Sequence, residues 1–248
     1  MNEFSIIIPV YNEERTIGNL IRTLVTFQSY GEILIVNDGS TDRTGRILEI
    51  TKKELPFELS KKLSIFHLEK NYGKGFALSF GVNKSKYPAT VFLDGDITNI
   101  SERDLLFLVS PLFNDEADMV LGIDNSSGKF YTDLFNILTG ERAIWKKDII
   151  SKISVMKKKK YGIEAYLNSL YEGKRVRFVE MFYVSHLIKF TKVSIPKSVM
   201  SYIKEGQEVA RELLRQKILT SNNSRQILRK INKLLGMAKS LKKIVVNL

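Results

Sequence analysis

Two aspartates separated by one glycine are the residues of this 248-residue sequence whose spacing best suits chemistry. Asp94 and Asp96 follow the apolar run of residues 89–93, which is typical of a buried strand in a parallel sheet. Side chains two residues apart in an extended chain point the same way, so both carboxylates can face one point. Hard oxygen ligands suit Mg²⁺ or Mn²⁺ held against substrate phosphates. The alternative is a solvated turn, because Asp and Gly favour turns.

An alternation of strand and helix patterns predicts the elements that position these aspartates. Strands are expected at residues 4–10, 32–36, 63–67, 89–93 and 118–122. Helices are expected at residues 17–25, 43–53, 76–82 and 101–112, the first capped by Asn12 and the last by Ser101. This order indicates an α/β fold with a doubly wound, mostly parallel, Rossmann-like sheet. Ligands of such sheets bind at the carboxyl ends of the strands.

The second half of the chain departs from this alternation. We expect a polar loop that is a candidate lid, a loop leading into a short strand, a helix and a strand, at residues 124–129, 139–145, 162–171 and 175–179. The expected main domain covers residues 1–195, divided into a first half (1–122) and a second half (123–195). A C-terminal helical extension is expected over residues 196–248.

Composition excludes several classes of protein. The chain is 44% hydrophobic and 27% charged, which is ordinary for a globular protein. It has no cysteine, which excludes disulfides, zinc–thiolate sites and a cysteine nucleophile. The first residues do not resemble a signal peptide, and no apolar run approaches the ~18 residues of a membrane span. We therefore expect a cytoplasmic protein.

The formal charge of +12 is concentrated towards the C-terminus. Residues 204–248 contain eleven Lys and Arg against three Glu, and a second cluster is Lys157–Lys160. Three interpretations of the tail are open: a helical hairpin packed on the main domain, a peripheral helix on an anionic membrane, or a homodimer contact through its apolar stripe. Nucleic-acid binding is disfavoured, because aromatic residues are not interleaved with the basic ones.

Four segments resemble, in order and spacing, the ordered motifs of family-two-type glycosyltransferases. They are residues 4–14, 35–42, 71–75 and 93–96. The resemblance implies a GT-A fold and a metal-dependent transfer of a hexose from a nucleoside diphosphate sugar, most simply UDP-linked. It leaves the acceptor unidentified, whether small molecule, polysaccharide or lipid carrier. The second half is also similar to glucosyl-3-phosphoglycerate and mannosylglycerate synthases.

The resemblance makes residues 1–195 a catalytic domain, with residues 1–122 as its donor half and residues 123–195 as its acceptor half. It also assigns roles in donor binding. It implies that the base and ribose lie against the first loop, that Asp38 bonds the base, and that Lys74 approaches the phosphates. Asp94 is then placed near the donor sugar and ribose. The implied donor-binding residues are Pro9, Tyr11, Glu13, Asp38, Lys74, Asp94 and Gly140. Taken singly, Lys74 is also compatible with a solvated lysine.

The resemblance also implies a metal site and a catalytic carboxylate. Asp96 and His186 are the implied metal ligands, although His186 is compatible with a structural histidine. Inverting relatives carry a base aspartate where this chain has Ala165. The catalytic candidates are therefore Glu164, ranked first, Glu141 and Asp94. The alternatives without a catalytic role are a carboxylate that stabilises a helix N-terminus for Glu164 and a surface ion pair for Glu141 with Arg142.

Two other functions stay open at this point. A sugar nucleotidyltransferase shares the α/β sheet and the metal, but it needs a basic phosphate loop after the first strand, and residues 9–13 supply no basic group. A non-catalytic nucleotide-sugar-binding or membrane-associated protein is the second alternative, because the base aspartate is absent at Ala165.

Overall fold

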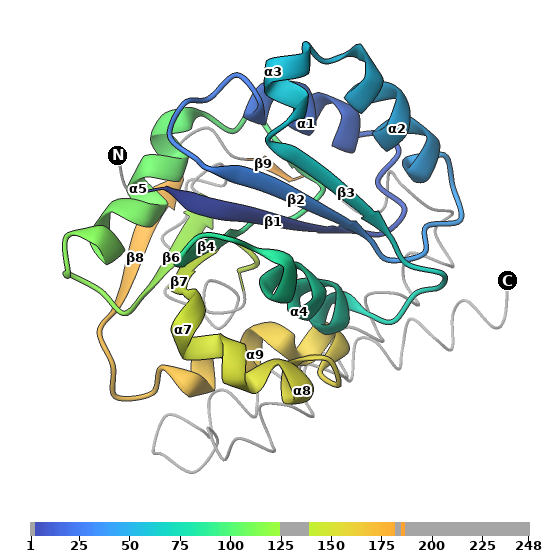
Figure 1. Ribbon diagram of the computed structural model, residues 1–248. Coiled ribbons are helices and arrows are strands. Elements are labelled where there is room, and N and C mark those ends of the chain that lie inside the picture. The colour runs from blue at the N-terminus through green and yellow to red at the C-terminus, as the bar shows by residue number, and fades with distance from the viewer. Residues whose placement is uncertain (1–2, 125–138, 182–184, 187–248) are drawn as a thin grey trace, which may run out of the picture.

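The computed structural model describes residues 3–124, 139–181 and 185–186, and Figure 1 shows their arrangement. A seven-stranded sheet runs through the centre with strand order β3-β2-β1-β4-β7-β6-β8. Its strands are β1 (Phe4–Val10), β2 (Glu32–Asn37), β3 (Leu63–His67), β4 (Ala89–Phe92), β6 (Met119–Asp124), β7 (Arg142–Trp145) and β8 (Val176–Met181). A small second sheet pairs β5 (Ile97–Thr98) with β9 (Ser185–His186).

The sheet is mostly parallel, as the sequence predicts. Strands β3, β2, β1 and β4 pair in parallel with one another, and β6 pairs in parallel with β8. Strand β7 is the exception, since it is antiparallel to both β4 and β6. It separates β4 from β6, the expected fifth strand, so the two halves of the chain share one sheet.

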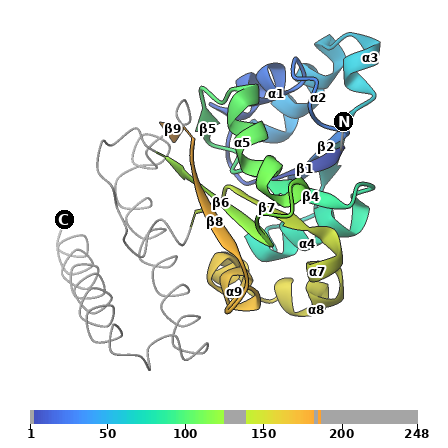
Figure 2. The ribbon, with the colours of Figure 1, turned by 90° about the vertical axis from the view of Figure 1, so that its left-hand side faces the viewer.

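Helices cover both faces of this sheet (Figures 1 and 2). They are α1 (Ile17–Leu24), α2 (Thr44–Glu54), α3 (Phe57–Ser60), α4 (Lys74–Lys84), α5 (Glu102–Phe113), α7 (Lys146–Ile149), α8 (Ile153–Met156) and α9 (Ile163–Leu170). Short 3₁₀ turns occupy residues 150–152 and 160–162. One apolar cluster packs α1, α2 and α5 against the sheet, and a second packs α4, α7, α8 and α9 against the other face.

The apolar runs explain the central strands. All residues of β2 and β4 are buried, as are all but Pro9 of β1, because helices cover the sheet on both sides. Such strands are apolar throughout instead of alternating. The same burial fixes where each strand ends, and therefore where the polar turns after it stand.

Some local predictions are confirmed and others are wrong. Ser101 caps α5 in a reciprocal capping box with Asp104. Asn12 does not cap α1, because that helix begins at Ile17 with Thr16 at the N-cap; Asn12 has φ 58° and bonds another loop. Helices α3, α7 and α8 were not expected, because their short length gives little periodicity. The candidate lid, apart from Asp124, and the C-terminal extension lie outside the described residues.

Candidate active site

The carboxyl ends of β1, β2 and β4 and the loop before α4 pack together at one edge of the sheet. Both oxygens of Asp38 accept backbone hydrogen bonds from the loop, from Tyr72 N and Gly73 N, each at 2.8 Å. Thr16 Oγ1 donates to the carbonyl of Gly95 at 2.9 Å, which ties the first loop to the Asp94–Asp96 turn. The motifs that are far apart in the sequence therefore form one continuous polar rim.

Asp38 is buried, and its position explains the shape of the loop that it binds. Gly73 has φ 99°, a conformation that side-chain-bearing residues rarely adopt, and the Asp38 carboxylate satisfies its backbone N–H. Burial raises the pKa of Asp38, and the two backbone hydrogen bonds oppose that rise. The expected contact of Asp38 with a base stays a prediction, while its contact with the loop is observed.

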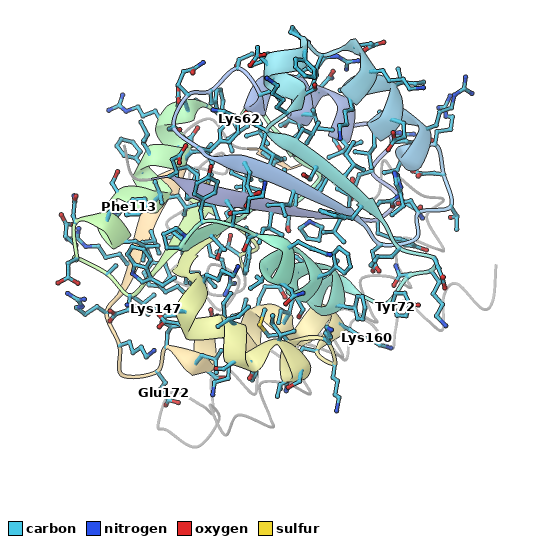
Figure 3. The ribbon with its side chains drawn as sticks, in the orientation of Figure 1. Lys62, Tyr72, Phe113, Lys147, Lys160 and Glu172 are labelled. Carbon is cyan, nitrogen blue, oxygen red and sulfur yellow. The ribbon has the colours of Figure 1, made fainter. Side chains whose placement is uncertain are left out.

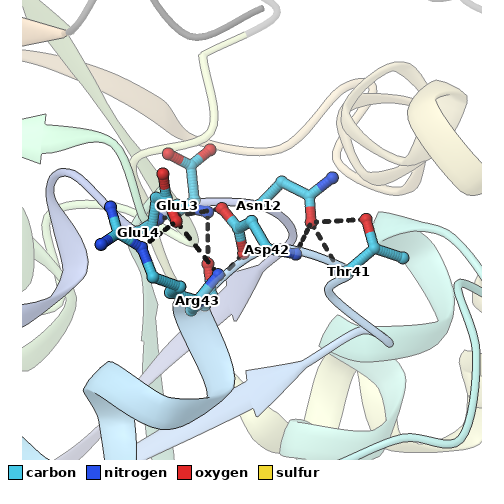
Figure 4. A network of polar contacts seen from close by, with 7 residues as sticks. Asn12, Glu13, Glu14, Thr41, Asp42 and Arg43 are labelled. Carbon is cyan, nitrogen blue, oxygen red and sulfur yellow. Dashed lines mark hydrogen bonds and ion pairs between the residues drawn. The ribbon is translucent and has the colours of Figure 1, made fainter.

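A polar network joins the loop after β1 to the turn after β2 (Figure 4). Asn12 Oδ1 accepts a hydrogen bond from Thr41 N at 2.8 Å, and Glu13 N donates to Thr44 Oγ1 at 2.8 Å. Arg43 Nε lies 3.1 Å from Glu14 Oε2. This exposed ion pair adds little stabilising energy, but it joins the same two loops. These contacts fix the position of the first loop beside the turn that carries Asp38.

The implied base-binding residues stand on this first loop. Pro9 lies within β1, opposite Val36 of β2. Tyr11 is 38% exposed, so its ring is available at the rim. A Cβ at Gly95 would lie 3.3 Å from Glu13 Cγ, so Glu13 packs closely against the aspartate turn.

Lys74 stands at the centre of the site. It is the first residue of α4, and its Nζ lies 2.6 Å from Asp94 Oδ1 and 2.6 Å from Glu164 Oε1. The side chains of Lys74, Asp94 and Glu164 are 19%, 29% and 10% exposed, so all three are largely shielded from water. Burial alone would lower the pKa of Lys74, but the two carboxylates outweigh it and raise that pKa. The solvated-lysine alternative is therefore wrong.

Strand β7 brings a buried arginine to the same place. Arg142 is 1% exposed and pairs with Phe92 of β4 across the sheet. Its Nη1 donates to Asn168 Oδ1 at 3.0 Å, and its Nη2 donates to the carbonyl of Thr139. Burial lowers the pKa of Arg142, and the nearby Glu164 is the strongest of the charges that oppose this.

Glu141 and Arg142 do not form the surface ion pair considered above. Glu141 is 4% exposed, and its Oε2 accepts a hydrogen bond from Thr139 Oγ1 at 2.6 Å. The prediction of a surface ion pair is wrong because β7 lies between β4 and β6 in the sheet. This position depends on contacts between distant segments, so the local sequence could not predict it. Asn168, which orients Arg142, was missed; it lies one helical turn after Glu164 on α9, and that spacing could have indicated it.

Gly140 allows the chain to approach Asp94 closely. A Cβ at residue 140 would lie 2.5 Å from both carboxylate oxygens of Asp94, well inside any normal contact. Glycine at this position therefore leaves room for the carboxylate that Lys74 holds. This steric relation links the loop before β7 to the turn after β4.

The two expected metal ligands lie close to each other in the small second sheet, Asp96 in the turn before β5 and His186 in β9. Asp96 directly precedes β5, and Ile97 of β5 is the register partner of His186 in β9. The side chain of His186 lies outside what the structure describes. Within the described side chains, no three of the types His, Cys, Asp or Glu gather as a metal cluster. A carboxylate from the turn before β5 and an imidazole from β9 are nevertheless a donor set that fits Mg²⁺ or Mn²⁺ with substrate oxygens completing the shell.

The fold and the polar rim define a GT-A glycosyltransferase architecture, and comparisons with known proteins agree. The model of Glycosyl transferase family 2 matches residues 5–171. The chain belongs to this family. Membership favours glycosyl transfer over nucleotidyl transfer.

The curated relatives with the higher identities match less than half of the chain. The dodecaprenyl-phosphate galacturonate synthase of Rhizobium johnstonii is 31% identical over 48% of this chain and 35% of its own length. The undecaprenyl-phosphate 4-deoxy-4-formamido-L-arabinose transferase of Edwardsiella ictaluri is 35% identical over 40% of this chain and 30% of its own. The chain thus spans about a third of the length of these relatives. An uncharacterized protein of Methanocaldococcus jannaschii is 25% identical over 84% of this chain and 96% of its own.

Solved structures share the fold. Glucosyl-3-phosphoglycerate synthase of Mycobacterium tuberculosis in complex with phosphoglyceric acid has a TM-score of 0.66 at 18% identity, covering 87% of this chain and 80% of that one. The same enzyme with Mn²⁺, UDP and phosphoglyceric acid has a TM-score of 0.65, covering 87% and 78%. At this identity the likeness concerns the fold alone.

Proposed function

We propose that this glycosyltransferase moves a hexose from a UDP-linked sugar to a phosphate-bearing acceptor with the help of Mg²⁺ or Mn²⁺. The observation that carries the proposal is the ion-paired group of Lys74, Asp94 and Glu164 at the edge where four loops converge. The UDP and Mn²⁺ held by a structural neighbour support the donor and the metal. The names of the matched proteins, which include lipid phosphates and phosphoglyceric acid, support the acceptor class.

On this proposal the donor lies along the polar rim. The base and ribose contact Pro9, Tyr11, Glu13 and Asp38, whose loops are held together by the network described above. Each carboxylate oxygen of Asp38 accepts one backbone hydrogen bond from the loop and has a further lone pair that can accept a hydrogen bond from the base. The exposed ring of Tyr11 offers a surface for the base to stack on.

The diphosphate and sugar then meet Lys74, Asp94 and the chain at Gly140. The ammonium of Lys74 is a compact charge on a flexible stem, so it can share its hydrogen bonds between the carboxylates and a phosphate. Lys74 holds Asp94 by an ion pair, and Gly140, which has no side chain, leaves room for the Asp94 carboxylate beside it. That position is the place assigned to the donor sugar and ribose.

Asp96 and His186 would hold the metal ion. When bound, it would neutralise charge on the leaving nucleoside diphosphate. The protein's own part is to keep these two donors close together, because Ile97, the residue after Asp96, is the register partner of His186.

Glu164 is our first candidate for the catalytic carboxylate. It is the second residue of α9, is 10% exposed at its side chain, and shares Lys74 with Asp94. The next residue, Ala165, is buried and carries no ionisable group, so no base can come from it. Glu141 is the second candidate, because it is buried and, like Glu164, lies close enough to the buried Arg142 for their charges to interact. Product anomers measured by NMR would distinguish inversion from retention.

The domain division is part of the same proposal. Residues 1–195 form the catalytic domain and residues 196–248 a basic helical tail that packs on it, binds an anionic membrane at the cytoplasmic face, or forms a homodimer. None of the described helices is long and apolar enough to cross a membrane. Sedimentation velocity of the full chain would separate the dimer from the monomer.

The test of the proposed function is Asp96→Ala assayed for Mn²⁺-dependent release of UDP from UDP-sugars. We expect UDP release to fall at least a hundredfold, on the order of the loss of one charge-stabilising contact in a transition state. The matched control is Asp115→Ala, which removes an aspartate that is paired with Arg175 away from the site. Full turnover by the Asp96 variant at every Mn²⁺ concentration would reject the metal assignment.

A further inference from the structure

A lysine-rich surface lies beside the candidate active site and has no role in the proposed reaction. It is formed by α7, the 3₁₀ turn after it, α8 and the residues that follow, here called the 146–160 face. Of its fifteen residues seven are lysine and one, Asp148, is acidic. The exposed lysines are Lys147, Lys152, Lys157, Lys158 and Lys160.

The one acidic residue of the face does not offset these charges at the surface. Asp148 is partly buried, and the hydroxyl of Tyr171 lies 3.4 Å from its Oδ2. Glu172 lies beyond Lys147 at the margin of the face, and it is followed by the exposed Lys174 (Figure 3). Seven lysines against one aspartate give the face a formal charge of 7 − 1 = +6, and five of those lysines are exposed.

Apolar side chains stand among the lysines. Ile149 and Met156 point into the core and are fully buried, so they already attach the face to the sheet. Ile150 and Val155 point outward and are 38% and 41% exposed. A face that presents ammonium groups around exposed aliphatic side chains matches an anionic bilayer, whose headgroups take the charge while its interface takes the apolar atoms.

The composition of the face argues against nucleic acid as the partner. Residues 146–160 contain no arginine, and the aromatic rings beside them, those of Trp145, Phe76 and Tyr166, are already covered by Lys147, Lys157 and Lys159. Nucleic-acid surfaces use aromatic rings and guanidinium planes to stack on bases, and arginine to bind phosphates with two parallel hydrogen bonds. Lysines on flexible stems are sufficient for a diffuse anionic surface such as a lipid headgroup layer.

The face is continuous with the loop that carries Lys74. A Cβ at Gly75 would lie 2.4 Å from the carbonyl oxygen of Met156, and one at Gly73 would lie 3.1 Å from Lys160 Cα. Figure 3 shows Tyr72 next to Lys160. A bilayer bound to this face would consequently adjoin the donor loop.

We propose that the 146–160 face docks the catalytic domain on an anionic lipid bilayer, with the loop before α4 at the edge of the contact. The proposal does not depend on the proposed reaction, since docking requires neither donor nor acceptor. It is also separate from the tail interpretation, because it assigns the contact to the catalytic domain itself.

The test is binding of the full chain to vesicles of phosphatidylcholine with and without phosphatidylglycerol. The variant Lys147→Glu/Lys152→Glu/Lys158→Glu reverses three exposed charges and leaves the donor loop untouched. We expect its partition coefficient on anionic vesicles to fall about a hundredfold or more, equivalent to about 1 kcal/mol for each lysine. Wild-type binding should weaken with added salt and be absent without phosphatidylglycerol.

The matched control is Arg46→Glu/Lys53→Glu/Lys61→Glu, on the α2–α3 side of the sheet. These residues are exposed, and α2 and α3 lie far from α8 in Figure 1. Both variants have the same formal charge, so the control should lose less than about threefold if the contact is local. Equal losses in both variants would show a net-charge effect, and no loss in either would assign binding elsewhere, such as the tail; each result overturns the proposal. Tighter wild-type binding to duplex DNA, lost in the first variant, would overturn it in favour of nucleic acid.

Discussion

Replacing Lys74 with methionine should destabilise the protein more than any surface substitution, because it removes the ammonium between two carboxylates. Lys74 Nζ lies 2.6 Å from an oxygen of each, so Asp94 and Glu164 would be left facing each other without their counter-ion. Methionine keeps the length of the stem and its apolar packing. The change therefore reports mainly on the charge.

The expected magnitude follows from the burial of the three groups. Breaking a buried ion pair by removing one partner costs about 3–5 kcal/mol. Asp94 keeps 29% of its side chain exposed, so water replaces part of the lost contact and we expect about 2–3 kcal/mol. For a chain of this size that is a fall in Tm of about 5–10 °C.

The pH dependence also has a definite sign. The two carboxylates raise the pKa of Lys74 in the folded state. A lysine with a raised folded pKa stabilises the protein fully below its unfolded pKa of about 10.4 and loses this effect as the pH rises through the folded value. The Lys74 contribution should therefore stay constant between pH 6 and about 9.

Urea unfolding at pH 7 of wild type, Lys74→Met, Glu164→Gln and the double variant measures the prediction. Groups in direct contact should show a coupling of about 0.5–3 kcal/mol in this cycle. Lys53→Met on exposed α2 is the control and should stay within about 0.5 kcal/mol of wild type. A Lys74→Met effect as small as the control, with no coupling to Glu164, would refute the ion-paired centre.

Two further predictions concern the neighbouring loops. Gly140→Ala places a methyl carbon where the Asp94 oxygens would be 2.5 Å away, so we expect a loss of about 1–3 kcal/mol in urea unfolding and at least tenfold slower UDP release; normal turnover would contradict it. Asp38→Asn leaves one of the N–H groups of Tyr72 and Gly73 without its acceptor, at a cost of about 1–3 kcal/mol. Because burial raises the pKa of Asp38, wild type should lose stability relative to this variant as the pH rises from about 4; urea midpoints at pH 4 and 7 check the sign, and a gain in relative stability would disprove it.

The donor half was predictable because its information is local. Apolar runs that are buried on both faces, with polar turns after them, predict β1 to β4 nearly to the residue. The carboxyl ends of parallel strands share one edge, so the loops could be placed together before any coordinates. Asn12 shows the limit, because its side chain binds the loop at Thr41 instead of a helix terminus.

The second half was less predictable because its placement depends on strand order. That β7 inserts between β4 and β6 is set by contacts between distant segments, and it is this insertion that buries Arg142 and Glu141. The short helices α7 and α8 have too few turns to show a periodicity.

The sequence by itself determined the fold class, the family resemblance and the position of Asp94 and Asp96 at the carboxyl end of a buried strand. All three depend on residue types and short spacings. The tertiary structure alone decided that Lys74 bridges Asp94 and Glu164 and that Asp38 holds the loop that carries Lys74. Ninety residues separate Lys74 from Glu164. Their contact arises because α4 and α9 pack on the same face of the sheet, and no local pattern records which helices meet there.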